Sequence, residues 1–203
     1  MNIKYRGSVS RIHFGLNDLP KIKGIKEDQM KTVFSISPSI KYLERAADKA
    51  KYGKISEDLF IEFTIPSMIN SDFAPDGKHV LSATVQYTPY HLRDQDWTDD
   101  LKEQLKNNVV SAIENYIPGF SGQIESFAVF SPMDVEDKFG LTEGNLNHGE
   151  MTLDQFFFMR PTMSCSQYIS PIENLYLCGP GTHPGGGLHG ANGFNAANEI
   201  LKG

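Results

Sequence analysis

The residues best suited to ligand chemistry lie between Asn174 and Gly203. This stretch holds a short apolar run, Leu175–Cys178, then a glycine-rich loop, then a segment from Ala191 to Leu201 with apolar residues at helical spacing. The loop glycines are Gly179, Gly181, Gly185, Gly186, Gly187 and Gly190. Glycines leave backbone N–H groups uncovered, and a helix N-terminus adds unsatisfied amides and a positive dipole end. Such a loop can receive a phosphate or the electron-rich edge of a ligand.

Other interpretations of this loop differ in how well the sequence supports them. A surface loop can use glycine simply to turn, but the order of apolar strand, glycines and helix favours a ligand loop. A P-loop is excluded, because GxxxxGK[ST] requires a lysine and a hydroxyl where Leu188 and His189 follow Gly187. Nucleoside triphosphate hydrolysis is therefore not expected.

Four segments, in this order, resemble blocks of the phytoene-desaturase-related FAD-dependent oxidoreductases, within the amine-oxidase-like flavoprotein superfamily. They read SVSRIHFGLNDLP, IPSMINSDFAPDGKHVLSATVQYTPY, FGLTEGNLNHGEMTLDQFFFMRP and LYLCGPGTHPGGGLHG. The resemblance implies the C-terminal portion of such an enzyme. A complete member opens with a strand, a GxGxxG turn and a helix, followed about 20 residues later by an acidic residue. The sequence lacks that whole element, so a missing N-terminal FAD-binding half is implied, and the isolated chain is predicted to be inactive alone.

The resemblance also implies a cofactor site. Residues 179–183 would lie near the ribityl and pyrophosphate groups of FAD, and residues 185–187 would approach the isoalloxazine ring. Residues 188–190 would direct amides toward the flavin edge where negative charge grows on reduction. The implied cofactor-binding residues are Gly179, Gly181, Thr182, His183, Gly185, Gly186, Gly187, Leu188, His189 and Gly190. In related amine oxidases an acidic side chain often occupies the place of Gly181, so here a backbone contact must substitute.

The reaction implied is hydride transfer between a hydrophobic small-molecule substrate, polyene or lipid-like, and the flavin. His189 is the candidate acid or base; alternatively it caps or packs at the helix start. The run Phe156–Met159 either lines an apolar substrate cavity or packs in a core. Polar groups expected to face such a cavity are His148, Glu150 and Arg160, which would look the same as a satisfied structural network.

A second hypothesis makes the chain a non-catalytic binding or interaction module derived from such an enzyme. The run Leu175–Cys178 is predicted to be a strand with bare edges, which favours a homodimer or an exchanged C-terminal segment. The histidines and Cys178 match no compact zinc spacing, so no metal is predicted. Cys165 and Cys178 are expected to be reduced thiols, with Cys178 buried in the strand.

Charge and hydropathy restrict the partners. The net charge of −6 and the lack of a Lys/Arg cluster argue against nucleic acid. The sequence contains no run of about 20 apolar residues and no signal peptide, which predicts a cytoplasmic protein. A peripheral membrane contact is left open, given the lipid-like substrate.

The elements that must position the loop form an α+β pattern with an antiparallel sheet and packed helices. Residues 1–173 are predicted to be substrate-domain-like, and residues 174–203 to supply the strand, loop and helix of an FAD-binding domain. Alternating apolar residues predict strands at Ser10–Leu16, Leu59–Ile65, Leu81–Tyr87 and Gln123–Phe130. Apolar periodicity and capping residues predict helices at Ile40–Tyr52, from Thr98 to Pro118, and at Met133–Phe139.

Overall fold

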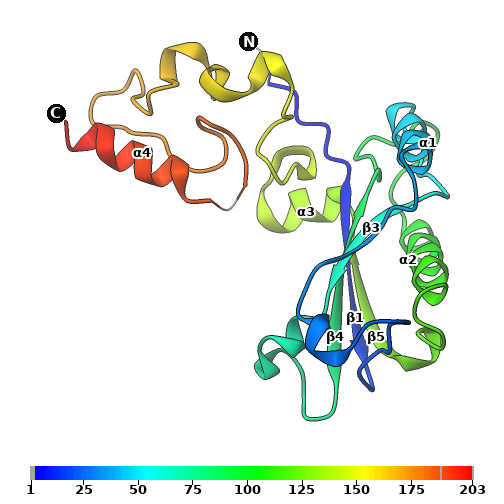
Figure 1. Cartoon of the computed structure of the whole chain (residues 1–203). Coiled ribbons are helices and arrows are strands. Elements are labelled where there is room, and N and C mark those ends of the chain that lie inside the picture. Colours follow the sequence, from blue (N-terminus) through cyan, green and yellow to red (C-terminus); the bar gives the residue numbers. More distant parts are fainter. Residues whose placement is uncertain (1–2, 188, 203) are drawn as a thin grey trace.

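The computed structural model describes residues 3–187 and 189–202. Five strands form one antiparallel sheet in the order β2-β3-β4-β1-β5 (Figure 1). The strands are β1 (Val9–Leu16), β2 (Phe34–Ile36), β3 (Phe60–Thr64), β4 (His79–Gln86) and β5 (Ile124–Phe130). The α-helices of the described residues are α1 (Ile40–Lys51), α2 (Asp99–Glu114), α3 (Pro132–Phe139) and α4 (Ala191–Ile200). The predicted α+β class is therefore confirmed.

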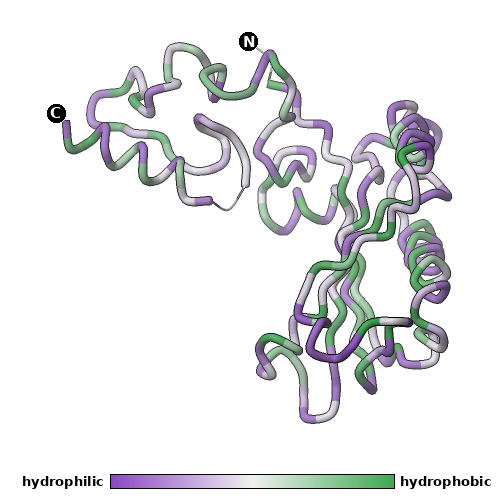
Figure 2. The backbone as a smooth tube through the Cα atoms, in the orientation of Figure 1, coloured by the Kyte–Doolittle hydropathy of each residue, from purple (hydrophilic) through white to green (hydrophobic). Residues whose placement is uncertain are grey.

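Strand β1 lies at the centre of the hydrophobic core, as its alternation predicts. Ile12, Phe14 and Leu16 are at most 1% exposed. Ile12 pairs with Ala83 of β4 on one side and with Val129 of β5 on the other, so the apolar face continues across three strands. Figure 2 shows hydrophobic and hydrophilic residues interleaved along these strands. The period of two thus fixes both the register and the buried face.

Helices α1 and α2 cover the same side of the sheet (Figure 1). Helix α2 begins at Thr98, whose side chain accepts a hydrogen bond from the Leu101 N–H, and the core side chains it contributes are Leu105, Val109 and Ile113. Helix α1 begins after Ser39, which caps it in the same way, and Gly53 follows it at φ 70°. The predicted starts of both helices are confirmed, and Gly53 adopts the left-handed conformation that commonly ends a helix.

The structure differs from the sequence predictions in three details. Strand β2 was not predicted, because its three residues are too few to show a period. The helix predicted from Thr98 to Pro118 ends earlier, at Glu114, so Tyr116 lies beyond its last turn and is 44% exposed. The predicted strand Leu175–Cys178 is wrong: only an isolated bridge between Ile169 and Tyr176 forms. A strand needs a neighbour to bond with, and the described part of this chain supplies none beyond that bridge.

Residues 145–202 contain few long elements and lie to one side of the sheet (Figure 1). The first described residues pack with them: the Lys4 N–H donates to Gln155 Oε1 (3.0 Å), and the Glu150 N–H donates to the Lys4 carbonyl (2.9 Å). The backbone at Lys4 therefore helps to position the candidate loop. The boundary between residues 173 and 174 stays a prediction. No helix among the described residues combines the length and apolarity that crossing a membrane demands.

Helix α3, which leads from the sheet toward residues 145–202, begins with a reciprocal cap. The fully buried Ser131 Oγ accepts the Asp134 N–H (3.2 Å), and Asp134 Oδ2 accepts the Ser131 N–H (2.8 Å). We expect Ser131→Ala to lower the free energy of unfolding by about 1 kcal/mol, because a helix amide loses its partner. Urea denaturation measures the change. Ser126→Ala, which alters an exposed serine of β5, should change it by less than about 0.5 kcal/mol; equal effects of the two variants would contradict the cap's contribution.

Candidate functional site

The glycine-rich loop, residues 179–190, runs directly into α4 (Ala191–Ile200) and depends on glycine conformations. Positive φ angles occur at Gly179 (95°), Gly185 (130°), Gly187 (115°) and Gly190 (70°). Residues with a Cβ adopt such angles at a cost, so the shape of the loop requires glycine at these positions. Gly190 occupies the N-cap position of α4. The helix N-terminus therefore faces the loop, as the sequence predicts.

The loop glycines differ in what surrounds them. A Cβ built at Gly185 would lie 2.9 Å from Phe156 Cε2, and one at Gly186 would lie 2.5 Å from Asn147 Oδ1. A Cβ at Gly179 or Gly190 would meet nothing within 4 Å among the described atoms. The first two glycines are therefore needed for packing inside the protein, while the other two border open space that a ligand can enter.

The side chain of Asn192, in the first turn of α4, holds the loop against the helix. It is 4% exposed, and its Nδ2 donates to the carbonyls of Thr182 (3.0 Å), His183 (3.0 Å) and Gly185 (3.3 Å). Thr182 in turn donates its hydroxyl to the Gly179 carbonyl at 2.8 Å. One buried amide thus contacts three carbonyls of the loop. Asn192 was not among the predicted site residues; an Asn at the start of a helix after glycines is a signal for such a contact.

Tyr168, which lies outside the loop in sequence, hydrogen-bonds to the middle of the loop and to α4. Its hydroxyl donates to the His183 carbonyl (2.8 Å) and accepts a hydrogen bond from Asn195 Nδ2 of α4 (2.9 Å). The ring atom Nδ1 of His183 is buried and has no hydrogen-bond partner among the described residues. An open cavity of about 680 Å³ is lined by residues that include Phe158, Tyr168, His183 and Asn195. Buried polar atoms normally have a hydrogen-bond partner, so this nitrogen is an exception within the loop.

Arg160 is buried beneath the loop, at 3% exposure. Its guanidinium donates to five backbone carbonyls, those of Gln155 (2.8 Å), Asn147 (2.7 Å), Pro180 (2.9 Å), Gly149 (2.6 Å) and Glu150 (2.9 Å). Burial lowers the pKa of Arg160, yet arginine remains protonated in proteins. The expectation that Arg160 faces a pocket is therefore wrong, and its satisfied network with backbone carbonyls is the alternative that the structure shows.

The other polar groups expected near a pocket are at the surface or paired. His148 is exposed and has a positive φ of 53°. Glu150 forms an ion pair with Arg6, and this hydrogen bond raises the pKa of Arg6. His189 is exposed, and its Nδ1 accepts the Ala191 N–H at 3.2 Å. That contact is the capping role left open for His189, whose catalytic role stays a prediction. Leu188 lies outside the described residues.

The run Phe156–Met159 is not a core segment of this chain. Phe157 and Phe158 are 50% and 62% exposed, and the first of them lies 6.3 Å from the His183 ring, between centroids. Phe156 is half-buried against Gly185. The core alternative is therefore wrong for the two exposed rings, which form an apolar surface next to the loop.

Gly185, Gly187 and Gly190 spell the letters G-x-G-x-x-G. In a dinucleotide-binding element this pattern follows a strand, and its glycines let the backbone approach a pyrophosphate. Here the described residues just before the pattern contain no strand, and Gly185 makes room for the Phe156 ring instead. The letters are present, but the described residues of the loop, 179–187 and 189–190, do not form the dinucleotide-binding element that these letters normally mark.

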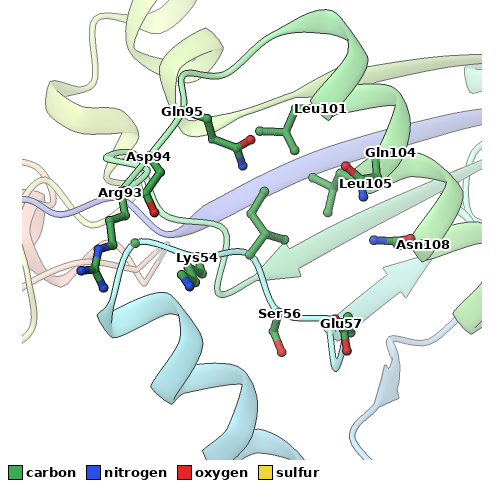
Figure 3. Close-up of a pocket in the computed structure, with 12 residues that line it drawn as sticks. Lys54, Ser56, Glu57, Arg93, Asp94, Gln95, Leu101, Gln104, Leu105 and Asn108 are labelled. Carbon is green, nitrogen blue, oxygen red and sulfur yellow. The ribbon is translucent and has the colours of Figure 1, made fainter.

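The remaining candidates for a functional site are a metal site, the two cysteines and a second cavity. Among residues 3–187 and 189–202, His, Cys, Asp and Glu nowhere form a group of three that could hold a metal ion. Cys165 is buried, whereas Cys178 is exposed, which corrects the expectation that Cys178 is buried in a strand. A polar cavity of about 370 Å³ lies between the end of α1 and α2 (Figure 3), and its lining includes Lys54, Arg93 and Asn108. None of its lining residues belongs to the glycine-rich loop.

No protein-family model matches the chain. The chain is 43% identical over 161 residues to pyridine nucleotide-disulfide oxidoreductase domain-containing protein 2 of Rattus norvegicus, a match that covers 79% of this chain and 28% of that protein. It is 28% identical over 165 residues to a lycopene-forming phytoene desaturase of Pantoea ananas, covering 79% of this chain and 32% of the relative. It is also 26% identical over 201 residues to one of the limonene dehydrogenase subunits of Castellaniella defragrans, covering 94% of this chain and 36% of the relative. The chain is therefore a homologue of these phytoene-desaturase-related oxidoreductases that matches only about a third of their length.

Proposed function

We propose that the chain forms the C-terminal portion of an FAD-dependent oxidoreductase that transfers hydride between a hydrophobic substrate and the flavin. The observation that carries this proposal is the glycine-rich loop at the start of α4, with open space at Gly179 and Gly190, in a homologue of oxidoreductases. The names of the relatives do not favour the interaction-module alternative.

The residues of the loop fit the role of holding a cofactor. Backbone amides around Gly179 and Gly190 are the groups that bind it under this proposal, together with the N-terminus of α4, whose dipole favours negative charge. The bound flavin supplies the hydride chemistry. Asn192 and Thr182 hold the loop in its observed conformation, and Phe157 and Phe158 present an apolar surface beside it.

The substrate we propose is an apolar molecule such as a polyene or another lipid-like compound. The names of two relatives mention phytoene and limonene. In this chain, the exposed rings of Phe157 and Phe158 next to His183 are the apolar groups that would contact such a substrate under this proposal. A peripheral membrane contact, which would give access to such a substrate, belongs to the same proposal.

The partner we propose is an FAD-binding half, to which residues 145–202 would contribute. Twelve large apolar side chains among the described residues of this segment are exposed. They are Leu146, Met151, Leu153, Phe157, Phe158, Met163, Ile169, Ile172, Leu175, Phe194, Ile200 and Leu201. An apolar surface of this kind marks an interface in a soluble protein. A homodimer through the same surface is the other way to cover it, and sedimentation of the chain distinguishes the two.

Titration with FAD tests the proposed cofactor. We expect no binding to the chain alone, and quenching of flavin fluorescence with a shift of the visible absorption bands when an N-terminal half is supplied. The supplied half is the part of the rat relative outside the matched segment. A chimaera that carries this chain in place of that segment provides the same test in one polypeptide, so that binding of FAD does not depend on the concentrations of two separate halves.

Two glycines provide a matched pair of variants. Gly190 and Gly77 have φ angles of 70° and 72°, and a Cβ at either would meet nothing within 4 Å. Both alanine variants therefore carry a similar strain, about 1 kcal/mol. We expect Gly190→Ala to raise the Kd for FAD at least about tenfold and Gly77→Ala to leave it unchanged. A folded chimaera that does not bind FAD would contradict the proposed function. Equal Kd values for both variants would show that the flavin does not bind at residues 179–190.

A further inference from the structure

We infer that Arg160 is a positioning residue that holds the glycine-rich loop in register with the segment 147–156 and places a positive charge beneath it for an anionic ligand group. This inference rests on the proposed function. Arg160 is buried and is not assigned a contact with the reacting atoms, so it acts by holding the backbone and through its positive charge.

The five hydrogen bonds of Arg160 connect two parts of the chain. Four go to carbonyls of one segment, at Asn147, Gly149, Glu150 and Gln155, and hold its backbone in a compact conformation. We call this segment, residues 147–156, the bed of the loop. The fifth goes to the carbonyl of Pro180, which lies between Gly179 and Gly181. The guanidinium is therefore the direct link between the bed and the first turn of the loop.

The bed also touches the loop at two further points. The Asn147 side chain lies against Gly186, and the ring of Phe156 and the methyl group of Met151 lie against Gly185. These contacts require the backbone of residues 147–156 to keep its shape. Because Arg160 binds four carbonyls of that backbone, its removal would loosen the contacts at Gly185 and Gly186 as well as the bond to Pro180.

The charge of Arg160 has no carboxylate partner among its hydrogen bonds. All five acceptors are neutral carbonyls, and the Glu150 carboxylate bonds to Arg6 instead. A buried cation without an ion pair raises the local potential and favours a nearby anion. The group that we propose is a phosphate or pyrophosphate approaching the loop at Gly179, whose neighbour Pro180 binds the guanidinium through its carbonyl.

Lysine cannot replace arginine in this geometry. A guanidinium offers five N–H donors in a planar fork, whereas an ammonium offers three donors from a single atom. Arg160→Lys therefore keeps the charge but leaves several buried carbonyls without partners. Arg160→Met removes both. The matched control is Arg45→Lys in α1, where a half-exposed arginine forms one ion pair with Asp58.

Hydrogen exchange in the full chain provides the first test and needs no flavin. We expect Arg160→Lys to speed exchange of the amides in residues 179–187 at least about tenfold, with the sheet amides of β1 and β4 unchanged. Arg45→Lys should change neither region. Unchanged exchange of residues 179–187 in a folded Arg160→Lys variant would overturn the inference.

The chimaera with the rat relative provides the second test. Where the unsubstituted chimaera binds FAD, we expect Arg160→Lys to raise the Kd at least about tenfold, Arg160→Met to raise it further, and Arg45→Lys to leave it unchanged. The visible bands of the flavin that remains bound should also differ, which a loss of general stability would not produce. An unaltered Kd in Arg160→Lys overturns the inference. If the unsubstituted chimaera fails to bind FAD, the proposed function fails, and hydrogen exchange alone decides the positioning role.

Discussion

Replacing Phe14 by alanine lowers the free energy of unfolding of the sheet by about 3–5 kcal/mol. Phe14 and Phe120 are both fully buried, and their rings meet edge to face with centroids 5.4 Å apart. Truncation removes apolar surface from the core and leaves a cavity between β1 and the chain after α2, which the surrounding strands cannot fill. Equilibrium unfolding in urea, followed by circular dichroism, measures the loss.

The matched control is Phe139→Ala at the end of α3, where the ring is 67% exposed. We expect that variant to change the free energy of unfolding by less than about 0.5 kcal/mol. A double-mutant cycle between Phe14 and Phe120 should show a coupling of about 0.5–1.5 kcal/mol. A loss for Phe14→Ala no larger than that for Phe139→Ala would contradict the placement of the core around β1.

Replacing Asn192 by leucine opens the glycine-rich loop while leaving the sheet folded. Leucine has a similar size but no donor, so the carbonyls of Thr182, His183 and Gly185 lose their shared partner. Buried acceptors without partners cost about 1–3 kcal/mol, which corresponds to about a 5-fold to 150-fold change in the opening equilibrium of the loop. Hydrogen exchange of residues 179–187 measures it, and binding of FAD to the chimaera should weaken by a similar factor.

Asn198→Leu is the control for that variant, because Asn198 lies on the same helix and is exposed. It should leave exchange in residues 179–187 unchanged. Equal exchange in the two variants would show that the Asn192 amide does not hold the loop.

The sheet could be predicted because its signals are local. Each of the strands β1, β3 and β4 is long enough to show alternation, and Ser39 and Thr98 lie where a capping side chain is expected. The failures have a different origin. Leu175–Cys178 has strand composition, but a strand also requires a partner, and Leu175 is 43% exposed without one among the described residues.

The site could be predicted only in its outline. Glycines before a helix indicate the loop, and the positive φ angles at Gly179 and Gly190 agree with that interpretation. The contacts that hold the loop are long-range or involve carbonyls that carry no sequence signal. Arg160 reaches Pro180 across 20 positions, and the contact of Asn192 with Gly185 depends on how the loop folds back. The spacing of residues along the sequence therefore could not show whether Arg160 lines a pocket or holds the backbone.

Hydrogen exchange of the chimaera with and without FAD tests whether this loop binds the flavin. We predict slower exchange of the amides in residues 179–187 and in the first turn of α4 when FAD is bound, together with protection in the supplied half. Protection confined to the supplied half, with FAD bound and exchange in residues 179–187 unchanged, would contradict the assignment of this loop to the flavin.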